Sequence, residues 1–232
     1  MENKVLLGKR LKSEKVKTAK KRTVSSTKWL QRQLNDPFVH EAQERGYRSR
    51  AAFKILEIDK KFKIFKKGQK VLDLGSAPGG WSQIIVQKVG HGNVLALDIL
   101  KMDEIEGVDF IQYNFLLDDA KKVLMDRIGG KKYDVVVSDM AANTTGDRQT
   151  DHLRTLGLIE SAFYFAITIL KDGGSFVGKV FQGGLEKELF DEFKRNFKEV
   201  KHFKPDSSRK ESVEMYIVAK GFRGENLLPK NE

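Results

Sequence analysis

The segment that most constrains the fold is a short hydrophobic strand that runs directly into a glycine-rich turn. Residues 71–74 read Val-Leu-Asp-Leu, glycines stand at positions 75, 79 and 80, and a helix-forming stretch follows. This order is typical of an α/β sheet that receives a nucleotide-like ligand at the end of a strand. The spacing is not GxGxxG and no GK[ST] follows, so the turn is neither a dinucleotide fingerprint nor a P-loop.

The residues around this turn indicate the kind of ligand. A pyrophosphate needs bare N–H groups at a helix N-terminus, whereas a ligand without phosphates accepts a bulkier turn such as the one that contains Pro78. The next predicted strand ends in Asp98, at a suitable distance to bond a ribose diol. The third ends near Asn114, where an adenine edge would lie. We therefore expect S-adenosylmethionine as cofactor; the alternative is a glycine-rich turn that binds nothing.

From residue 69 onward, short β-branched runs alternate with amphipathic segments of helical length, which predicts a doubly wound α/β sheet with helices on both faces. We expect strands at 70–74, 93–98, 109–113, 133–138, 174–180, 199–203 and 215–220. Helices are expected near 80–89, 117–129, 151–170 and 185–197, after earlier helical stretches that begin near residue 36 and cover 49–65. The last two strands are close in sequence, so they predict a terminal hairpin and a mostly parallel, seven-stranded sheet whose last strand is antiparallel.

Charge divides the chain unevenly. Residues 1–28 hold ten basic and two acidic side chains, which is +8 of the net +11. Such a segment cannot bury enough surface to fold alone. It predicts a basic arm over 1–28, a catalytic domain over 29–222 and a tail over 223–232. The arm is interpreted equally well as a nucleic-acid contact or as a solubilising extension.

Other features exclude several functional classes. Cysteine is absent and the four histidines are scattered, so we expect no disulfide, no cysteine nucleophile and no metal site. No apolar run is long enough to span a bilayer. We expect a soluble, cytoplasmic protein that does not associate with membranes.

Two charged residues stand out where the predicted sheet should bind its ligand. Asp139 follows the strand 133–138 at its carboxyl end, whereas Asp134 begins that strand and is interpreted as solvated. Lys179 lies within the apolar run 175–181, and burying an ammonium group is costly unless it is paired or deprotonated. We expect Asp139 to be its partner. Lys54 and Glu214 are weaker candidates, because single charged residues at such positions are more often solvated.

Five segments, in this order, resemble the FtsJ (RrmJ/RlmE) family of S-adenosylmethionine-dependent ribosomal RNA 2′-O-ribose methyltransferases. They are 48–54 (RSRAAFK), 73–83 (DLGSAPGGWSQ), 138–141 (SDMA), 178–183 (GKVFQG) and 204–209 (KPDSSR). The resemblance covers roughly residues 30–220. It implies the Rossmann-like methyltransferase fold and a catalytic tetrad of Lys54, Asp139, Lys179 and Glu214.

The resemblance also implies the ligand contacts. The residues expected to contact the cofactor are Gly79, Gly80, Trp81, Asp98, Asn114 and Asp139. At Asn114 the chain departs from the family, where Asp is expected; the amide oxygen still accepts a hydrogen bond, but without charge assistance. Independently of the resemblance, Arg48, Arg50 and Arg209 are expected to contact RNA phosphates, because Arg48 and Arg50 flank the proposed site; the alternative is a general solubility surface.

The expected reaction is transfer of a methyl group to a ribose hydroxyl, with Lys179 as general base and Glu214 positioning Lys54 or the ribose. A lysine base must have its pKa lowered. Burial and Lys54 would lower the pKa of Lys179 and Asp139 would raise it, so the sequence leaves the net direction open.

The expected substrate is a uridine of 23S ribosomal RNA in the large subunit, and the expected state is a monomer. The alternatives are methylation of tRNA or an mRNA cap, a non-catalytic RNA-binding assembly protein and, less favoured, a nicotinamide oxidoreductase.

Overall fold

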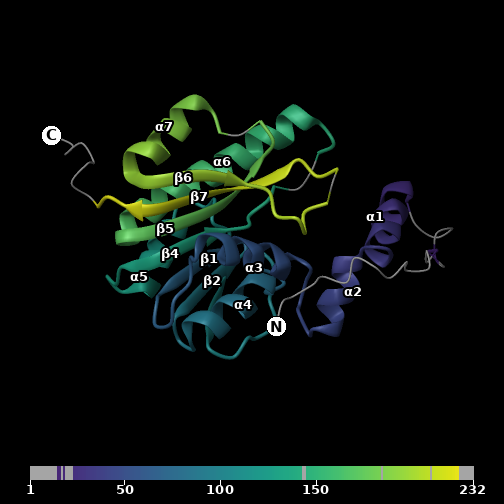
Figure 1. Ribbon diagram of the computed structural model, residues 1–232, viewed down its shortest axis with the longest axis horizontal. Helices are drawn as coiled ribbons and strands as arrows, with labels where there is room; N and C mark the ends of the chain where they lie inside the picture. Colours follow the sequence, from purple (N-terminus) through teal and green to yellow (C-terminus); the bar gives the residue numbers. More distant parts are fainter. Residues whose placement is uncertain are drawn as a thin grey trace.

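The computed structural model describes residues 15–16, 18, 23–142, 145–183, 185–209 and 211–224. Helices and strands alternate along most of this length (Figure 1). The strands are β1 (Val71–Leu74), β2 (Val94–Asp98), β3 (Val108–Gln112), β4 (Tyr133–Ser138), β5 (Leu170–Phe181), β6 (Phe197–Phe203) and β7 (Glu214–Phe222). The helices are α1 (Val24–Leu34), α2 (Pro37–Glu44), α3 (Ala51–Phe62), α4 (Gly80–Val89), α5 (Ala120–Ile128), α6 (Arg148–Ile169) and α7 (Lys187–Asn196).

All these strands form one sheet in the order β3-β2-β1-β4-β5-β7-β6. Strands β1 to β5 pair in parallel, and β7 runs antiparallel to both β5 and β6. This confirms the predicted Rossmann-like architecture with its antiparallel last strand. The strand order reverses between β1 and β4, and sheets of this kind bind ligands outside the carboxyl ends of the strands at such a point.

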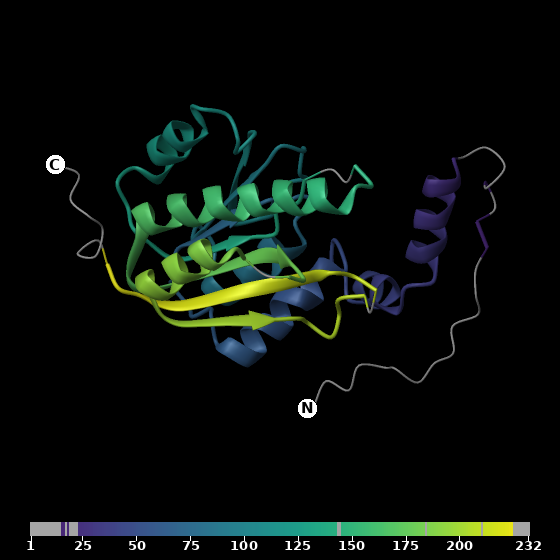
Figure 2. The same ribbon diagram turned by 90° about the horizontal axis from the view of Figure 1, so that it is seen from above.

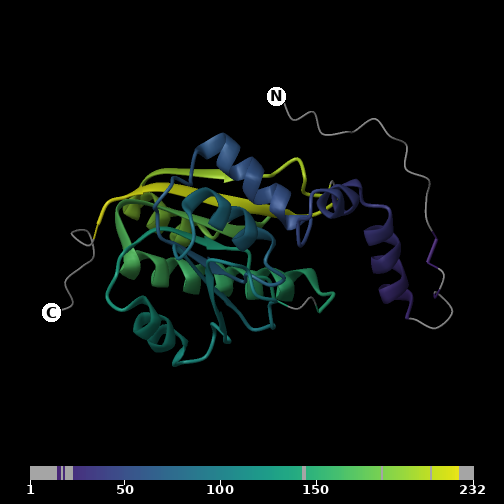
Figure 3. The same cartoon turned by 90° about the horizontal axis from the view of Figure 1, so that it is seen from below.

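Two cores cover the two faces of the sheet because side chains alternate along each strand. Val135 and Val137 of β4 belong to the core under α3 and α4. Val136 between them belongs to the core under α5, α6 and α7, where Phe163 and Phe193 are fully buried. Figures 2 and 3 show these helices on opposite sides of the sheet.

Several element boundaries differ from the sequence prediction by a few residues, and those of α3 and β5 have a clear local cause. Helix α3 ends at Phe62 instead of continuing to Phe65, because Lys63 adopts a left-handed conformation with φ of 54°. The Asp59 carboxylate then accepts a hydrogen bond from the backbone N–H of Phe65 at 2.9 Å and holds the turn. Strand β5 begins at Leu170, where α6 leads directly into it, and the β4–β5 register shifts near Tyr133 to accommodate exposed residues 171–173.

The N-terminal helices lie at one end of the sheet, with α1 the farther from it (Figures 1 and 2). The Thr23 and Asp36 side chains cap α1 and α2 by accepting hydrogen bonds from Ser26 N–H and Phe38 N–H. Because α1 starts at Val24, it crosses the boundary expected between residues 28 and 29. The rest of the predicted arm, apart from residues 15, 16, 18 and 23, lies outside the described residues, as do residues 225–232 of the predicted tail. Within the described part of the chain, no helix has the length and hydropathy needed to span a membrane.

Candidate active site

The residues of the expected tetrad come from four separate elements. Lys54 lies in the first half of α3, Asp139 follows β4, Lys179 lies in β5 and Glu214 is the first residue of β7. Antiparallel pairing sets Lys179 opposite Tyr216 and Phe181 opposite Glu214. The sheet therefore brings together side chains that are up to 160 residues apart in the sequence.

Three ion pairs join the tetrad into one chain. The Nζ of Lys54 lies 2.7 Å from Oε1 of Glu214, and the same oxygen lies 3.2 Å from Nζ of Lys179. That amine is also 2.9 Å from Oδ1 of Asp139 and donates to the Asp139 backbone oxygen at 2.9 Å. All four side chains are at least four-fifths buried, with exposed fractions of 10 to 17%. The Lys179 side chain is therefore shielded from solvent, as the apolar strand around it predicts.

The electrostatics resolve the direction of the Lys179 pKa that the sequence leaves open. Burial disfavours the ammonium form, but the carboxylates of Asp139 and Glu214 outweigh burial and raise the pKa of Lys179 above its usual value. Burial would likewise raise the pKa of Glu214, but the ammonium groups of Lys179 and Lys54 lower it to about 2. The expected lowering of the Lys179 pKa by Lys54 does not dominate, because Lys54 is paired with Glu214. In this arrangement Lys179 is protonated.

Tyr216 is a member of the site that the sequence analysis missed. Its hydroxyl donates to Oδ1 of Asp139 at 2.7 Å and lies 3.1 Å from Oε1 of Glu214. The side chain is fully buried, with its ring 5.5 Å from that of Trp81, and burial together with the two carboxylates raises its pKa well above the usual value. The sequence could have indicated Tyr216, because residues two apart in a strand, such as 214 and 216, point to the same side of the sheet.

We expect Tyr216→Phe to reduce methyl transfer by about 10-fold while the fold is kept, because a hydrogen bond to a charged group contributes about 1.5–3 kcal/mol. Asp139 would lose the phenol that fixes its rotamer but would keep Lys179. Turnover at saturating cofactor measures the effect, and Tyr113→Phe is the matched control because its hydroxyl bonds the exposed Asp119. Equal turnover of the two variants would show that the phenol does not contribute to the reaction.

Side chains of the protein pack closely against the glycine turn after β1. Gly79 has φ of 103°, and a Cβ there would lie 2.7 Å from Cδ1 of Ile105. A Cβ on Gly80 would lie 2.2 Å from the hydroxyl of Ser49. The hydroxyl of Ser76, within the turn, is buried and has no hydrogen-bond partner. Such an orphaned polar atom in a glycine-shaped turn is what a polar ligand group could satisfy.

Asp98 and Asn114 lie at the ends of β2 and β3, as expected. The Asp98 carboxylate accepts hydrogen bonds from Ala77 N–H at 2.8 Å and from Leu100 N–H at 2.7 Å. Asp98 thus ties the turn after β1 to the end of β2 and keeps further lone pairs for hydroxyl groups. The Asn114 amide oxygen accepts from Leu116 N–H at 3.0 Å and likewise has a second lone pair.

Trp81 is 2% exposed, and its side chain belongs to the core. The indole Nε1 donates to the Ala51 backbone oxygen at 2.9 Å, so the ring joins α4 to the start of α3. Any contact of Trp81 with a cofactor would therefore come from its backbone.

A buried carboxyl lies beneath the same turn. Asp73 of β1 accepts a hydrogen bond from Ser82 Oγ at 2.6 Å, while its other oxygen has no partner. Burial raises the pKa of Asp73 to about 7 despite this bond, and the charges of Asp139 and Asp98 add to the rise. A good fraction of the molecules therefore hold Asp73 neutral at neutral pH.

This raised pKa makes a prediction about stability. In the unfolded chain the carboxyl titrates near 3.8. Its contribution to the free energy of unfolding is therefore complete at acid pH and is lost as pH rises through about 7, because the folded protein holds the proton more tightly than the unfolded chain does. Asp73→Asn fixes a neutral group. Relative to the natural chain, its free energy of unfolding should rise by up to about 4 kcal/mol from pH 4 to pH 8. Urea unfolding at both pH values measures this, with the exposed Asp126→Asn as control; a difference that does not change with pH would contradict it.

The arginines expected to bind RNA have different environments. Arg50 and Arg209 converge on one carboxylate oxygen of the buried Asp36, at 2.8 and 3.0 Å. Arg50 also donates to the Ser207 backbone oxygen. Two cations share one anion there, and the carboxylates of Glu214 and Glu211 also act on the charge of Arg50. Arg48 instead directs its guanidinium at backbone oxygens of the loops after β1 and β2.

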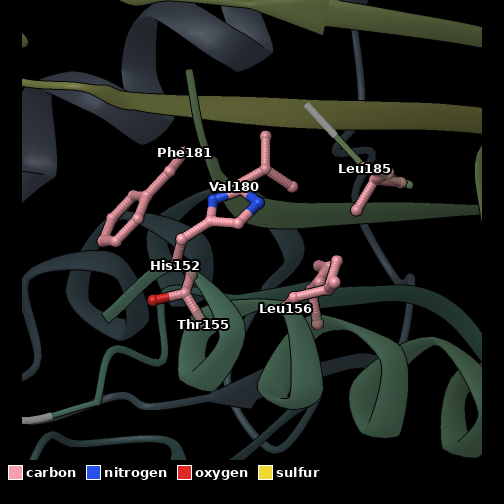
Figure 4. Close-up of a pocket in the computed structure, with 7 residues that line it drawn as sticks. His152, Thr155, Leu156, Val180, Phe181 and Leu185 are labelled. Atoms are coloured by element: carbon pink, nitrogen blue, oxygen red, sulfur yellow. The ribbon is translucent and has the colours of Figure 1, made fainter. Parts of the chain in front are cut away.

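A small cavity of about 10 Å³ lies near the end of β5 and is separate from the tetrad. His152 of α6 lies beside Val180 and Phe181 there, with Thr155 and Leu156 on the helix below (Figure 4). Val180 and Lys179 are consecutive in a strand, so they point to opposite faces of the sheet. The cavity has room for about one water molecule and does not extend the candidate site.

Solved structures share this architecture. A Plasmodium falciparum protein provisionally described as a ribosomal RNA methyltransferase is 32% identical, with a TM-score of 0.68 over 77% of this chain and 100% of that one. A Lactococcus lactis protein provisionally described as a hemolysin shares the fold at 17% identity and a TM-score of 0.55, over 74% of this chain and 86% of that one. With its sheet order, the chain falls in the class of Rossmann-like methyltransferases.

Sequence comparison narrows this class. Residues 47–222 match the family model of FtsJ-like methyltransferases. A protein from Paramagnetospirillum magneticum, "Ribosomal RNA large subunit methyltransferase E", is 56% identical over 94% of this chain and 91% of its own length. A protein of the same description from Novosphingobium aromaticivorans is 52% identical over 91% of this chain and 95% of its own length. The chain belongs to the FtsJ-like methyltransferase family.

Proposed function

We propose that the protein methylates the ribose 2′-hydroxyl of a uridine in 23S ribosomal RNA, with S-adenosylmethionine as methyl donor. The observation that carries this proposal is the buried chain of ion pairs Lys54–Glu214–Lys179–Asp139 beside the glycine turn. The description of the relatives as large-subunit ribosomal RNA methyltransferases supports the choice of RNA. The acceptor atom and the base follow from the resemblance of the five segments.

The cofactor would be held at the ends of β1 to β4. Gly79 and Gly80 would let it approach the backbone, Asp98 would accept from its ribose hydroxyls, and Asn114 would accept from its adenine amino group. Asp139 would face its positive charge. When bound, S-adenosylmethionine supplies a methyl group on a positively charged sulfur atom.

The tetrad would prepare the acceptor hydroxyl. Methyl transfer would form the new O–C bond and break the bond between sulfur and the methyl carbon, with S-adenosylhomocysteine as the leaving group. Removing the hydroxyl proton during this step would require a base, and Lys179 is the amine nearest to Asp139. Because its pKa is raised, Lys179 must first lose a proton. The positive charge of the cofactor next to Asp139 would weaken the attraction that holds this proton, so binding of the cofactor would favour the neutral amine and release of the proton to solvent. Glu214 would keep Lys54 and Lys179 in register.

RNA would approach over α3 and the loop between β6 and β7. Arg50 and Arg209 would meet phosphate groups there, with Asp36 fixing the spacing of the two guanidinium groups. The proposed setting is a cytoplasmic enzyme that acts as a monomer on RNA of the large ribosomal subunit. A complete tetrad argues against the alternative of a non-catalytic assembly protein.

Mapping 2′-O-methyl groups in ribosomal RNA with and without this protein tests the proposal. We expect one uridine of 23S RNA to lose its methyl group when the gene is deleted and to regain it with purified protein and S-adenosylmethionine. Large subunits and free 23S RNA should be offered separately. A lost methyl group on tRNA or on a base would assign a different substrate, and an unchanged map with no methyl transfer in vitro would favour the non-catalytic alternative.

A further inference from the structure

The side chain of Arg48 joins two loops that are far apart in the sequence. Its Nη1 donates to the backbone oxygen of Asp103 at 2.6 Å and to that of Pro78 at 3.4 Å, and its Nη2 donates to the oxygen of Glu104 at 2.5 Å. Pro78 is in the glycine turn after β1, and residues 103–104 are in the loop after β2. Both terminal nitrogens of the guanidinium are thereby directed at backbone oxygens within the protein.

The neighbourhood of Arg48 is packed as well as hydrogen-bonded. A Cβ on Gly79 would lie 3.0 Å from Cδ of Arg48 and 3.0 Å from Sδ of Met102, so the arginine stem and the loop after β2 enclose this glycine. The Arg48 backbone N–H donates to Oε1 of Gln83 at 3.0 Å, and Nε2 of Gln83 donates to the Gly46 oxygen at 2.9 Å. The segment before α3 is therefore attached to the glycine turn and to α4.

We propose that Arg48 is a positioning residue for the cofactor and not a phosphate contact for RNA. It fixes the distance between the glycine turn and the loop after Asp98, and these are the two loops that would enclose the ribose and the amino-acid part of S-adenosylmethionine. This inference rests on the proposed function. It revises the sequence-based assignment of Arg48 to RNA binding.

Arg50, two residues later, provides a matched comparison within the same segment. Its guanidinium points to the other side, where it pairs with Asp36 and the Ser207 oxygen and shares that carboxylate with Arg209. Both residues carry the same charge and lie close in sequence. The two residues differ only in the loops that they contact. If Arg48→Ala and Arg50→Ala change cofactor affinity and RNA affinity in opposite ways, the loss of one positive charge cannot be the cause.

The sign of the charge effect separates positioning from electrostatics. S-adenosylmethionine carries one more positive charge than S-adenosylhomocysteine. Removing a nearby cation would relieve Coulomb repulsion and so favour the more cationic ligand. Weaker binding of both ligands by the same factor would therefore come from lost loop geometry. A lysine at position 48 restores the charge but lacks the planar fork that bridges two loops.

The experiment measures cofactor and RNA affinity separately for four proteins: the natural chain, Arg48→Ala, Arg48→Lys and Arg50→Ala. Calorimetry with S-adenosylmethionine and S-adenosylhomocysteine gives the first affinity, and filter binding of 23S ribosomal RNA gives the second. One hydrogen bond from a charged donor corresponds to about a tenfold change in an equilibrium constant, so both Arg48 variants should bind both ligands about 10-fold or more weakly. Their RNA affinity should stay within about twofold, whereas Arg50→Ala should show the reverse pattern.

Several outcomes would overturn the inference. Unchanged cofactor affinity in Arg48→Ala, or a loss of RNA affinity equal to that of Arg50→Ala, assigns Arg48 to RNA after all. Full rescue by Arg48→Lys shows that charge and not bridging matters. If thermal unfolding shows that Arg48→Ala does not fold, the cofactor affinity and the RNA affinity of Arg48→Lys test the inference instead. A natural chain that binds neither ligand would instead refute the proposed function, so the two failures are distinguishable.

Discussion

Replacing Lys179 with alanine should lower the rate of methyl transfer by about 10³-fold, since positioned proton transfer contributes about 10² to 10⁴ in rate. The amine is buried, lies 2.9 Å from Asp139 and is the group through which the hydroxyl proton would leave. Cofactor affinity should change little, because Asp139 keeps the hydrogen bond from Tyr216 and Glu214 keeps its ion pair with Lys54. Single-turnover methylation of large-subunit RNA and calorimetry with S-adenosylmethionine measure the two quantities.

Two companion variants distinguish a base from a structural cation. Lys179→Arg retains the positive charge but cannot be deprotonated at working pH, so it should be nearly as inactive as the alanine variant. Lys171→Ala should keep normal turnover. It removes an exposed lysine near the other end of β5, where Lys171 pairs with Asp134. Near-normal activity of Lys179→Arg would exclude Lys179 as the base.

Asp139→Asn should have the second-largest effect, a loss of about 10²-fold in kcat/KM, because a hydrogen bond to a charged group contributes about 1.5–3 kcal/mol. The Asp139 carboxylate accepts from both Lys179 and Tyr216 and would face the positive charge of the cofactor. We therefore expect weaker cofactor binding together with slower turnover, unlike the Lys179 variants. Asp134→Asn, at the other end of β4, is the control.

The same variant makes a prediction about pH. A reaction that needs neutral Lys179 becomes faster as pH rises through the pKa of that amine. The Asp139 carboxylate is the largest of the influences that raise this pKa, so its removal should lower the pKa and move the rising limb of the pH–rate profile to lower pH. An Asp139→Asn profile that rises at the same pH as that of the natural chain would show that Asp139 does not hold the Lys179 proton.

Local chemistry explains what could be predicted from the sequence. The strands could be predicted because they are short, β-branched apolar runs, and the glycine turn could be predicted because its residues are adjacent in the sequence. Lys179 stands out since a cation in the middle of an apolar strand needs a partner. These are properties of neighbouring residues, so they are present before the chain folds.

Long-range contacts explain what could not be predicted from the residues alone. Lys54 and Glu214 were weak candidates that depended partly on the family resemblance, because each alone is one charged residue among many. Their pairing depends on α3 packing against the sheet and on the register of β5 with β7. The direction of the Lys179 pKa was open for the same reason, as it depends on which carboxylates are within about 3 Å.

The amino-acid sequence by itself determined the α/β sheet, the glycine turn and the presence of a buried lysine near Asp139, because spacing and polarity along the chain specify them. Only the tertiary structure decided that Tyr216 joins the two carboxylates and that Arg48 and Arg50 face different loops. The physical reason is that hydrogen bonds and ion pairs act over a few ångströms, and the chain positions that meet at those distances are set by strand register and helix packing.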